Sequence, residues 1–256
     1  MPNFAANLTM MFTEVPFLDR FQAAKDAGFE AVEFLFPYDH TVPEVSTRAH
    51  QVGVTVALFN MPPGDWAAGE RGIAALADRK EEFQVGVTRA IEYARALDCK
   101  TLHLMSGLVP EGAEQEAMME TYTNSLRYAA DAAQEIGATV VIEPLNNRDV
   151  PGYLISDVST AQSLVDAVAR PNVGIQFDMY HVQIMEGDLA KRFEKHLDDI
   201  RHVQIAGVPE RHEPNIGEVN YPYLFQMMDR LGYQGYVGCE YNPRGVTQDG
   251  LDWISN

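Results

Sequence analysis

The sequence predicts an α/β protein, a (β/α)8 (TIM) barrel that forms a single domain over residues 1–256. Short apolar β-runs alternate with segments of helical period, eight times along the chain. The β-runs are apolar almost throughout, which is typical of a parallel sheet covered on both faces. A chain of 256 residues, 46% of them hydrophobic, also has the usual size for one such barrel.

Eight β-runs and the helices between them account for most of the chain. The β-runs are expected at 3–8, 31–36, 54–60, 101–107, 139–146, 173–181, 200–207 and 236–243. Helices are expected at 16–27, 43–53, 79–97, 114–135, 158–168, 189–197 and 223–231, and the last helix is reduced to the 250–256 tail. The first helix shows the typical signals, because a proline begins it and Gly28 follows its end.

A doubly wound open sheet is the alternative arrangement of the same elements. That fold binds dinucleotides at a GxGxxG turn after its first strand, and no such turn follows residues 3–8. The barrel is therefore preferred, and no nucleotide cofactor is expected. No internal repeat, linker or low-complexity tract divides the chain.

Charge and cysteine content narrow the class of protein. Its 19 basic and 37 acidic residues give a net charge of −18, which disfavours nucleic acid and anionic membranes as partners. The first residues lack the basic start of a signal peptide, and no stretch reaches the roughly 18 apolar residues of a membrane span. Cys99 and Cys239 are too few for a disulfide framework. A cytoplasmic protein is expected.

The last four β-runs each end in a residue that could bind a metal. These residues are Glu143, Asp178, Gln204 and Glu240, and they are spaced about one βα unit apart. In a barrel, side chains at the carboxyl ends of the strands converge on one face. Any one of them alone could equally be a helix cap or an ion-pair partner, but their recurrence predicts one shared site.

Three carboxylates and an amide oxygen are hard donors. They suit magnesium or manganese better than zinc, which prefers nitrogen and sulfur. Without a cation, three neighbouring buried carboxylates would raise one another's pKa. The sequence therefore predicts a divalent metal cofactor, with an arginine as the other way to balance the charge.

Several further residues are candidates near this face. His181 is expected beyond Asp178, on the loop that leaves the strand, and Arg211 on the loop after the seventh β-run, and both could bind substrate. The plain alternatives are a loop histidine without such a role and, for Arg211, an ion pair with Glu210 or Glu213. His103 and His202 lie inside β-runs and are expected to be core groups or groups behind the site.

The long connection at 60–79 is either a lid over the substrate or a packed surface loop. Its Trp66 could cover the substrate and its Arg71 could add positive charge. Cys239 should point to the face opposite Glu240, because successive side chains in a strand alternate.

The sequence resembles the hydroxypyruvate isomerase family, a branch of the xylose isomerase-like barrels, essentially from end to end. The stretches that carry the resemblance are FAANLTMMFTEVPFLDRF, AVEFLFPYD, PPGDWAAGERGIAAL, IEPLNNRDVPGY, QFDMYHVQIMEGDL, HEPNIGEVNYPYLF and GCEYNPRG. The resemblance implies a metal held by Glu143, Asp178, Gln204 and Glu240. It also implies that the two glutamates exchange protons with the substrate. Related epimerases place histidine where this chain has Gln204, so the choice of metal stays open.

The implied activity is that of a hydroxypyruvate isomerase, an enzyme of carbohydrate metabolism. It would interconvert hydroxypyruvate and tartronate semialdehyde through an enediolate, without a redox cofactor. A 2-oxo-tetronate substrate is the alternative within the family. The sequence does not decide which of Glu143 and Glu240 acts as the base, nor whether the protein forms a homo-oligomer. A DNA repair nuclease of the endonuclease IV type and a non-catalytic sugar-acid binding protein are the alternatives from other classes.

Overall fold

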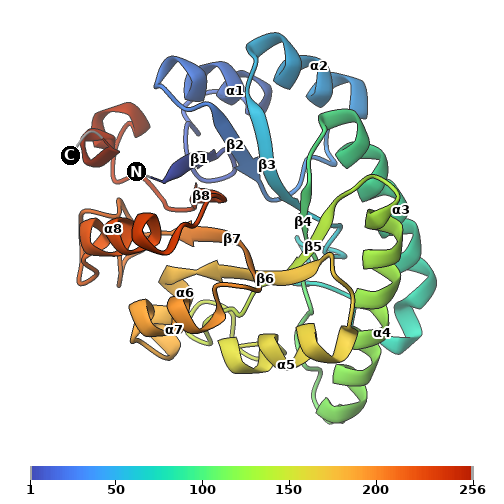
Figure 1. Cartoon of the computed structure of the whole chain (residues 1–256). Coiled ribbons are helices and arrows are strands. Elements are labelled where there is room, and N and C mark those ends of the chain that lie inside the picture. Colours follow the sequence, from blue (N-terminus) through green and yellow to red (C-terminus); the bar gives the residue numbers. More distant parts are fainter. Residues whose placement is uncertain (1, 255–256) are drawn as a thin grey trace.

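The structure, a computed structural model, describes residues 2–254 and contains a closed barrel of parallel strands (Figure 1). Each strand pairs in parallel with the next one along the chain, and the first pairs with the last. The strands are β1 (Asn3–Asn7), β2 (Ala31–Phe34), β3 (Thr55–Asn60), β4 (Thr101–His103), β5 (Thr139–Ile142), β6 (Val173–Asp178), β7 (Ile200–Ile205) and β8 (Tyr236–Cys239). The predicted barrel is confirmed.

Helices surround the barrel and cover the outer face of the sheet (Figure 1). They are α1 (Phe17–Asp26), α2 (Val42–Val52), α3 (Lys80–Leu97), α4 (Gln115–Gln134), α5 (Val158–Val168), α6 (Met179–Met185), α7 (Leu189–His196) and α8 (Tyr221–Leu231). Short 3-10 turns lie at Ala77–Arg79, Thr247–Gly250 and Asp252–Ile254. No helix within residues 2–254 combines the length and the apolar character needed to cross a bilayer.

The segment after β6 differs from the prediction. The strand ends at Asp178, as expected, but His181 was expected on an exiting loop, and the helix α6 begins at once instead. The cause is a cap, because the Asp178 carboxylate accepts a hydrogen bond from the backbone N–H of Tyr180 at 2.8 Å. His181 therefore lies on the first turn of a helix and not on a loop. At the chain's end, the predicted tail forms 3-10 turns, and residues 255–256 lie outside the described residues.

The interior of the barrel is unusually polar. Barrels of this kind are normally filled by layers of branched apolar side chains. Here Asn7, Glu33, Gln176, His202 and Gln204 are all buried. Contacts among them join strands that are not neighbours in the sheet, which places them inside the barrel. The apolar core lies instead between the strands and the surrounding helices.

Replacing Phe177 by alanine tests how strongly the β6–α7 packing supports the fold. Phe177 is fully buried, and its ring meets Phe193 of α7 edge to face at a centroid distance of 5.7 Å. We expect Phe177→Ala to lower the free energy of unfolding by about 3–5 kcal/mol, measured by urea denaturation. Val85→Ala, at an exposed position on α3, should change it by less than about 0.5 kcal/mol. Equal effects of the two substitutions would contradict this account of the core.

Candidate active site

Three carboxylates meet at one end of the barrel because their strands end there. Glu143 directly follows β5, Asp178 is the last residue of β6, and Glu240 directly follows β8. Together with His181 they offer ligand atoms that all lie within 4.8 Å of one another, and all four residues are buried. The predicted convergence of these three acids is therefore present in the structure.

The hydrogen bonds of His181 decide which of its ring nitrogens carries a proton. Its Nδ1 accepts a hydrogen bond from the backbone N–H of Asn146 at 3.1 Å. Burial lowers the His181 pKa well below its ordinary value, so the ring is neutral and carries its proton on Nε2. This nitrogen lies 3.5 Å from Asp178 Oδ2 and 3.9 Å from Glu143 Oε1. His181 thus presents a hydrogen-bond donor to the site, which suits contact with a substrate oxygen better than binding to a metal.

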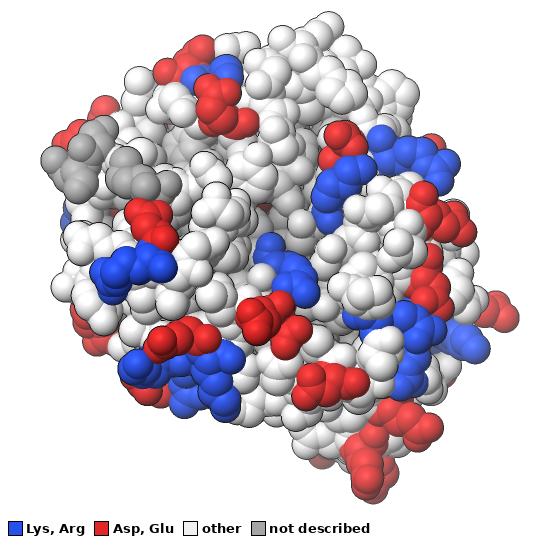
Figure 2. All heavy atoms as spheres, viewed as in Figure 1, with Lys and Arg blue, Asp and Glu red and all other residues white. Residues whose placement is uncertain are grey.

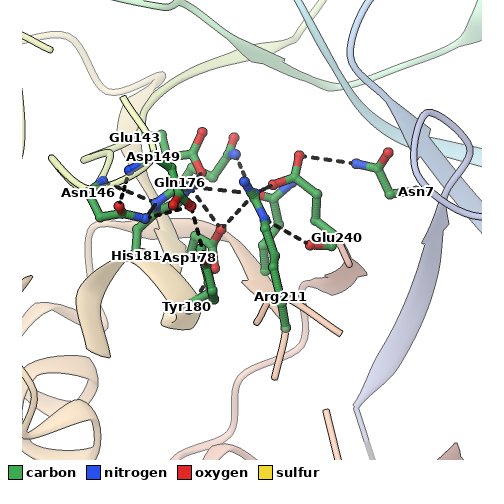
Figure 3. Close-up of polar contacts among 12 residues, drawn as sticks. Asn7, Glu143, Asn146, Asp149, Gln176, Asp178, Tyr180, His181, Arg211 and Glu240 are labelled. Carbon is green, nitrogen blue, oxygen red and sulfur yellow. Dashed lines mark hydrogen bonds and ion pairs between the residues drawn. The ribbon is translucent and has the colours of Figure 1, made fainter. Parts of the chain in front are cut away.

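Arg211 lies between the carboxylates (Figure 3). Its Nη2 forms a close ion pair with Glu240 and lies 3.7 Å from Asp178 Oδ2. Its guanidinium also packs over the Tyr180 ring, 4.9 Å from the centroid. Arg211 adopts a left-handed backbone with φ of 57°, which fits a position fixed by its surroundings. Arg211 therefore pairs with Glu240 and lies near Asp178, in place of the ion pair with Glu210 or Glu213 that the sequence offered as an alternative.

Burial raises the pKa of all three carboxyl groups, and their mutual repulsion adds to this effect. Burial raises the pKa of Glu143, and the nearby Glu240 and Asp178 raise it further. Burial also raises the pKa of Asp178 and of Glu240, and in both cases Arg211 offsets part of the shift. One arginine cannot neutralise three ionised carboxylates, so the site favours a further positive charge.

The donor atoms fit a hard divalent cation. Glu143 Oε1 and Asp178 Oδ2 are buried and have no hydrogen-bond partner among the residues that the structure describes. Buried oxygens without partners are costly, and a bound cation would satisfy them. Carboxylate oxygens are the ligands that magnesium and manganese prefer.

Gln204 lies beside this cluster, and its amide contacts other groups. It pairs with Asp178 in the register of β6 and β7. Its Oε1 accepts a hydrogen bond from Gln176 Nε2 at 2.5 Å, and its Nε2 donates to Glu33 Oε1 at 2.8 Å. The structure therefore places Gln204 next to the predicted metal site, with its oxygen toward β6.

Three residues of this region are absent from the sequence-based predictions: Asn7, Glu33 and Gln176. Two of them carried a signal. Glu33 is an acid in the middle of the apolar stretch AVEFLF, and Gln176 is two residues before Asp178, hence on the same face of the strand. Asn7 offered no comparable signal, and only the closure of the barrel brings it to Glu240 (Figure 3).

The remaining candidates surround the carboxylates. His103 lies behind Glu143, with Nδ1 3.4 Å from Oε2, and burial lowers its pKa to about 3. His202 contacts Glu33, as expected for a group behind the site. Cys239 packs in the apolar core. On the 60–79 loop, the Arg71 guanidinium stacks 3.8 Å from the Trp66 ring centroid, so these two residues contact each other.

An open hollow leads toward Arg211. It has a volume of about 500 Å³ and includes Arg148, Tyr180 and Arg211 in its lining. Figure 2 shows a depression near the middle of this face of the molecule, with basic and acidic side chains on its rim. Arg148 and Arg211 both line this hollow, so a small anionic molecule that entered it would meet positive charge.

Known proteins share this fold and much of this sequence. A 2-oxo-tetronate isomerase of Cupriavidus necator is 52% identical over 99% of this chain and 98% of its own length. A hydroxypyruvate isomerase of Escherichia coli is 44% identical, with coverage of 99% and 98%. A crystal structure described as AP endonuclease, family 2, from Brucella melitensis is 55% identical, has a TM-score of 0.98, and covers 100% of this chain and 98% of its own.

These comparisons confirm the predicted resemblance and the prediction of an enzyme of the isomerase class. The profile of the xylose isomerase-like TIM barrel family matches residues 21–256. The chain belongs to the xylose isomerase-like TIM barrel family.

Proposed function

We propose that this protein is a divalent-metal-dependent isomerase that moves a carbonyl group between neighbouring carbons of a short 2-oxo acid. The observation that carries the proposal is the buried group of three carboxylates, Glu143, Asp178 and Glu240, whose oxygens lie within 4.8 Å of one another and of a His181 ring nitrogen. The metal would be held by the three carboxylates and Gln204. When bound, it would supply a Lewis acid that stabilises the negative charge of an enediolate.

The residues of the chain divide the remaining work. One of Glu143 and Glu240 removes the proton from the carbon that bears the hydroxyl group. The same glutamate or the other one returns a proton to the neighbouring carbon, which completes the exchange of carbonyl and hydroxyl. The His181 Nε2–H donates to a substrate oxygen, and Arg211, which faces both the acids and the hollow, binds the substrate carboxylate.

The identities favour a four-carbon 2-oxo-tetronate as the substrate. Three full-length relatives named 2-oxo-tetronate isomerase are 52%, 47% and 47% identical. The relative named hydroxypyruvate isomerase from Escherichia coli is 44% identical, which keeps hydroxypyruvate as the second candidate. Both acids carry a carbonyl beside a carboxylate, and the four-carbon acid has one additional hydroxymethyl group.

A DNA repair nuclease is a weaker candidate, supported by the description of the Brucella melitensis structure. Such an enzyme must neutralise backbone phosphates with basic residues. This chain has a net charge of −18, and the face in Figure 2 mixes acidic and basic side chains without a continuous basic groove. Incision of DNA at an abasic site by the purified protein would revive this candidate.

Removal of divalent cations should abolish isomerisation. Without a cation, the Arg211 guanidinium is the only arginine or lysine group within residues 2–254 that pairs with these buried acids, and negative charge on the enediolate is not stabilised. We expect EDTA treatment followed by gel filtration to remove activity, and added Mn²⁺ or Mg²⁺ to restore it. A control sample treated with EDTA saturated with Mg²⁺ should stay active. Full turnover by protein shown to be metal-free would rule out the metal-dependent mechanism.

Glu143→Gln and Glu240→Gln should each block proton exchange while the fold survives. Each change keeps the side-chain shape but removes the group that takes up a proton, so we expect a loss of about 10²–10⁴-fold. The measurement is deuterium incorporation into the substrate in D₂O, followed by NMR. Glu186→Gln, which changes an acid that pairs with Arg192 outside this site, is the matched control. Normal exchange in either active-site variant would remove that glutamate from the mechanism.

The substrate is decided by comparing 2-oxo-tetronate with hydroxypyruvate under the same conditions. We expect kcat/KM to be higher for the four-carbon acid, because its extra hydroxymethyl group offers additional contacts that the shorter acid lacks. Higher kcat/KM for hydroxypyruvate would reverse this order and leave the rest of the proposal intact.

A further inference from the structure

Glu33 is a buried acid that the proposed mechanism does not use. Its side chain is fully buried inside the barrel. Three groups contact its carboxylate: Asn7 Nδ2 at 3.0 Å, His202 Nε2 at 2.6 Å and Gln204 Nε2 at 2.8 Å. These partners lie on β1 and β7, so Glu33 links both sides of the barrel below the candidate metal site.

The local backbone leaves space for this carboxylate. A β-carbon added to Gly238 of β8 would lie only 2.2 Å from Glu33 Oε2 and 2.3 Å from Oε1. The backbone of Gly238 does not have a positive φ, so close approach and not backbone conformation requires glycine here. The register between β2 and β3 also shifts at Val32 and Glu33, an irregularity that can redirect a side chain near an active site. The fold is thus adapted to hold Glu33 in this place.

The contacts of the Glu33 carboxylate fix the direction of two amides. An amide side chain can present either its oxygen or its nitrogen to a neighbour, and its partners decide which. A carboxylate only accepts hydrogen bonds, so Asn7 and Gln204 must both turn their nitrogens toward Glu33. The oxygen of Gln204 is then left facing β6, where Gln176 contacts it in the structure.

The side-chain amide of Asn7 contacts both Glu33 and Glu240. Its Nδ2 donates to Glu33 Oε1 at 3.0 Å and lies 3.3 Å from Glu240 Oε1. Its Oδ1 accepts from the backbone N–H of Thr9 at 3.0 Å, which holds the other end of the amide. Asn7 therefore connects Glu33 to one of the two proposed proton-transferring glutamates.

We infer that Glu33 is a positioning residue of the metal site: through Asn7 and Gln204 it holds Glu240 in place and presents the Gln204 oxygen as a ligand. This inference rests on the proposed metal-dependent function. Glu33 itself does not touch the metal or the substrate. It acts on the arrangement of the residues that bind the metal directly, and the loss of such supporting contacts typically lowers metal affinity by about 10–100-fold.

The test is Mn²⁺ binding by calorimetry, with no substrate present. Glu33→Gln keeps the shape of the side chain but adds an N–H₂ group that cannot accept from its three donors. We expect the Mn²⁺ Kd to rise by about 10–100-fold. Glu186→Gln should leave the Kd unchanged. A merely structural role would lower the unfolding free energy of the metal-free protein and leave Mn²⁺ affinity unaltered, which would overturn the inference.

A double-mutant cycle with Gln204→Glu separates positioning from simple loss of negative charge. A carboxylate at position 204 has two equivalent oxygens, so no amide orientation can be lost there. In that background the part of the effect that depends on the Gln204 amide should be lost, so Glu33→Gln should raise the Mn²⁺ Kd less than it does in the unmodified protein, while the part that acts through Asn7 and Glu240 remains. An undiminished effect in the double variant would show that Glu33 does not act through the orientation of Gln204, and the inference would be wrong.

Two controls keep these outcomes distinct. If Glu33→Gln does not fold, Asn7→Ser, which removes the donor to Glu33 and Glu240, takes its place, and an unchanged Mn²⁺ Kd in this variant would overturn the inference. If the unmodified protein itself does not bind Mn²⁺, the proposed function fails first. If it binds and the variants bind equally well, only the role of Glu33 fails.

Discussion

The balance of charge among buried carboxylates is the constraint on which this molecule depends. Glu143, Asp178 and Glu240 come from three different strand ends and lie together out of contact with bulk water. Such a cluster is unfavourable by itself, because burial and mutual repulsion both oppose ionisation. Arg211 offsets part of this cost through its ion pair with Glu240. The unfavourable energy of such a cluster is offset when its negative charge interacts with a bound cation or with a reacting substrate.

The polar interior of the barrel follows from the same constraint. Ordinary barrel cores fill their interior with apolar side chains, whereas this one contains hydrogen-bonded amides, a histidine and Glu33 below the acids. These groups keep the ligands aligned from beneath, and the apolar packing that stabilises the fold lies outside the strands. Stability and chemistry are thus served by opposite faces of the same sheet.

The sequence predicted the barrel and its three acids because both depend on local patterns. Apolar runs at regular intervals specify the strands, and an acid at the end of a run specifies its place at the rim. The sequence could not predict contacts that depend on barrel closure, such as those of Asn7 with Glu33 and Glu240. The helix α6 was missed because Asp178 has two roles: it ends an apolar strand and caps the next helix. Its capping role was hidden by the apolar run.

The most direct test of this account is a crystal structure of the protein loaded with Mn²⁺, with the ion located by its anomalous scattering. We expect one ion within about 2.5 Å of oxygens of Glu143, Asp178 and Glu240, with the Gln204 oxygen turned toward it. An ion bound elsewhere, or carboxylates that stay paired with Arg211 at saturating Mn²⁺ without binding the ion, would show that these acids do not form a metal site.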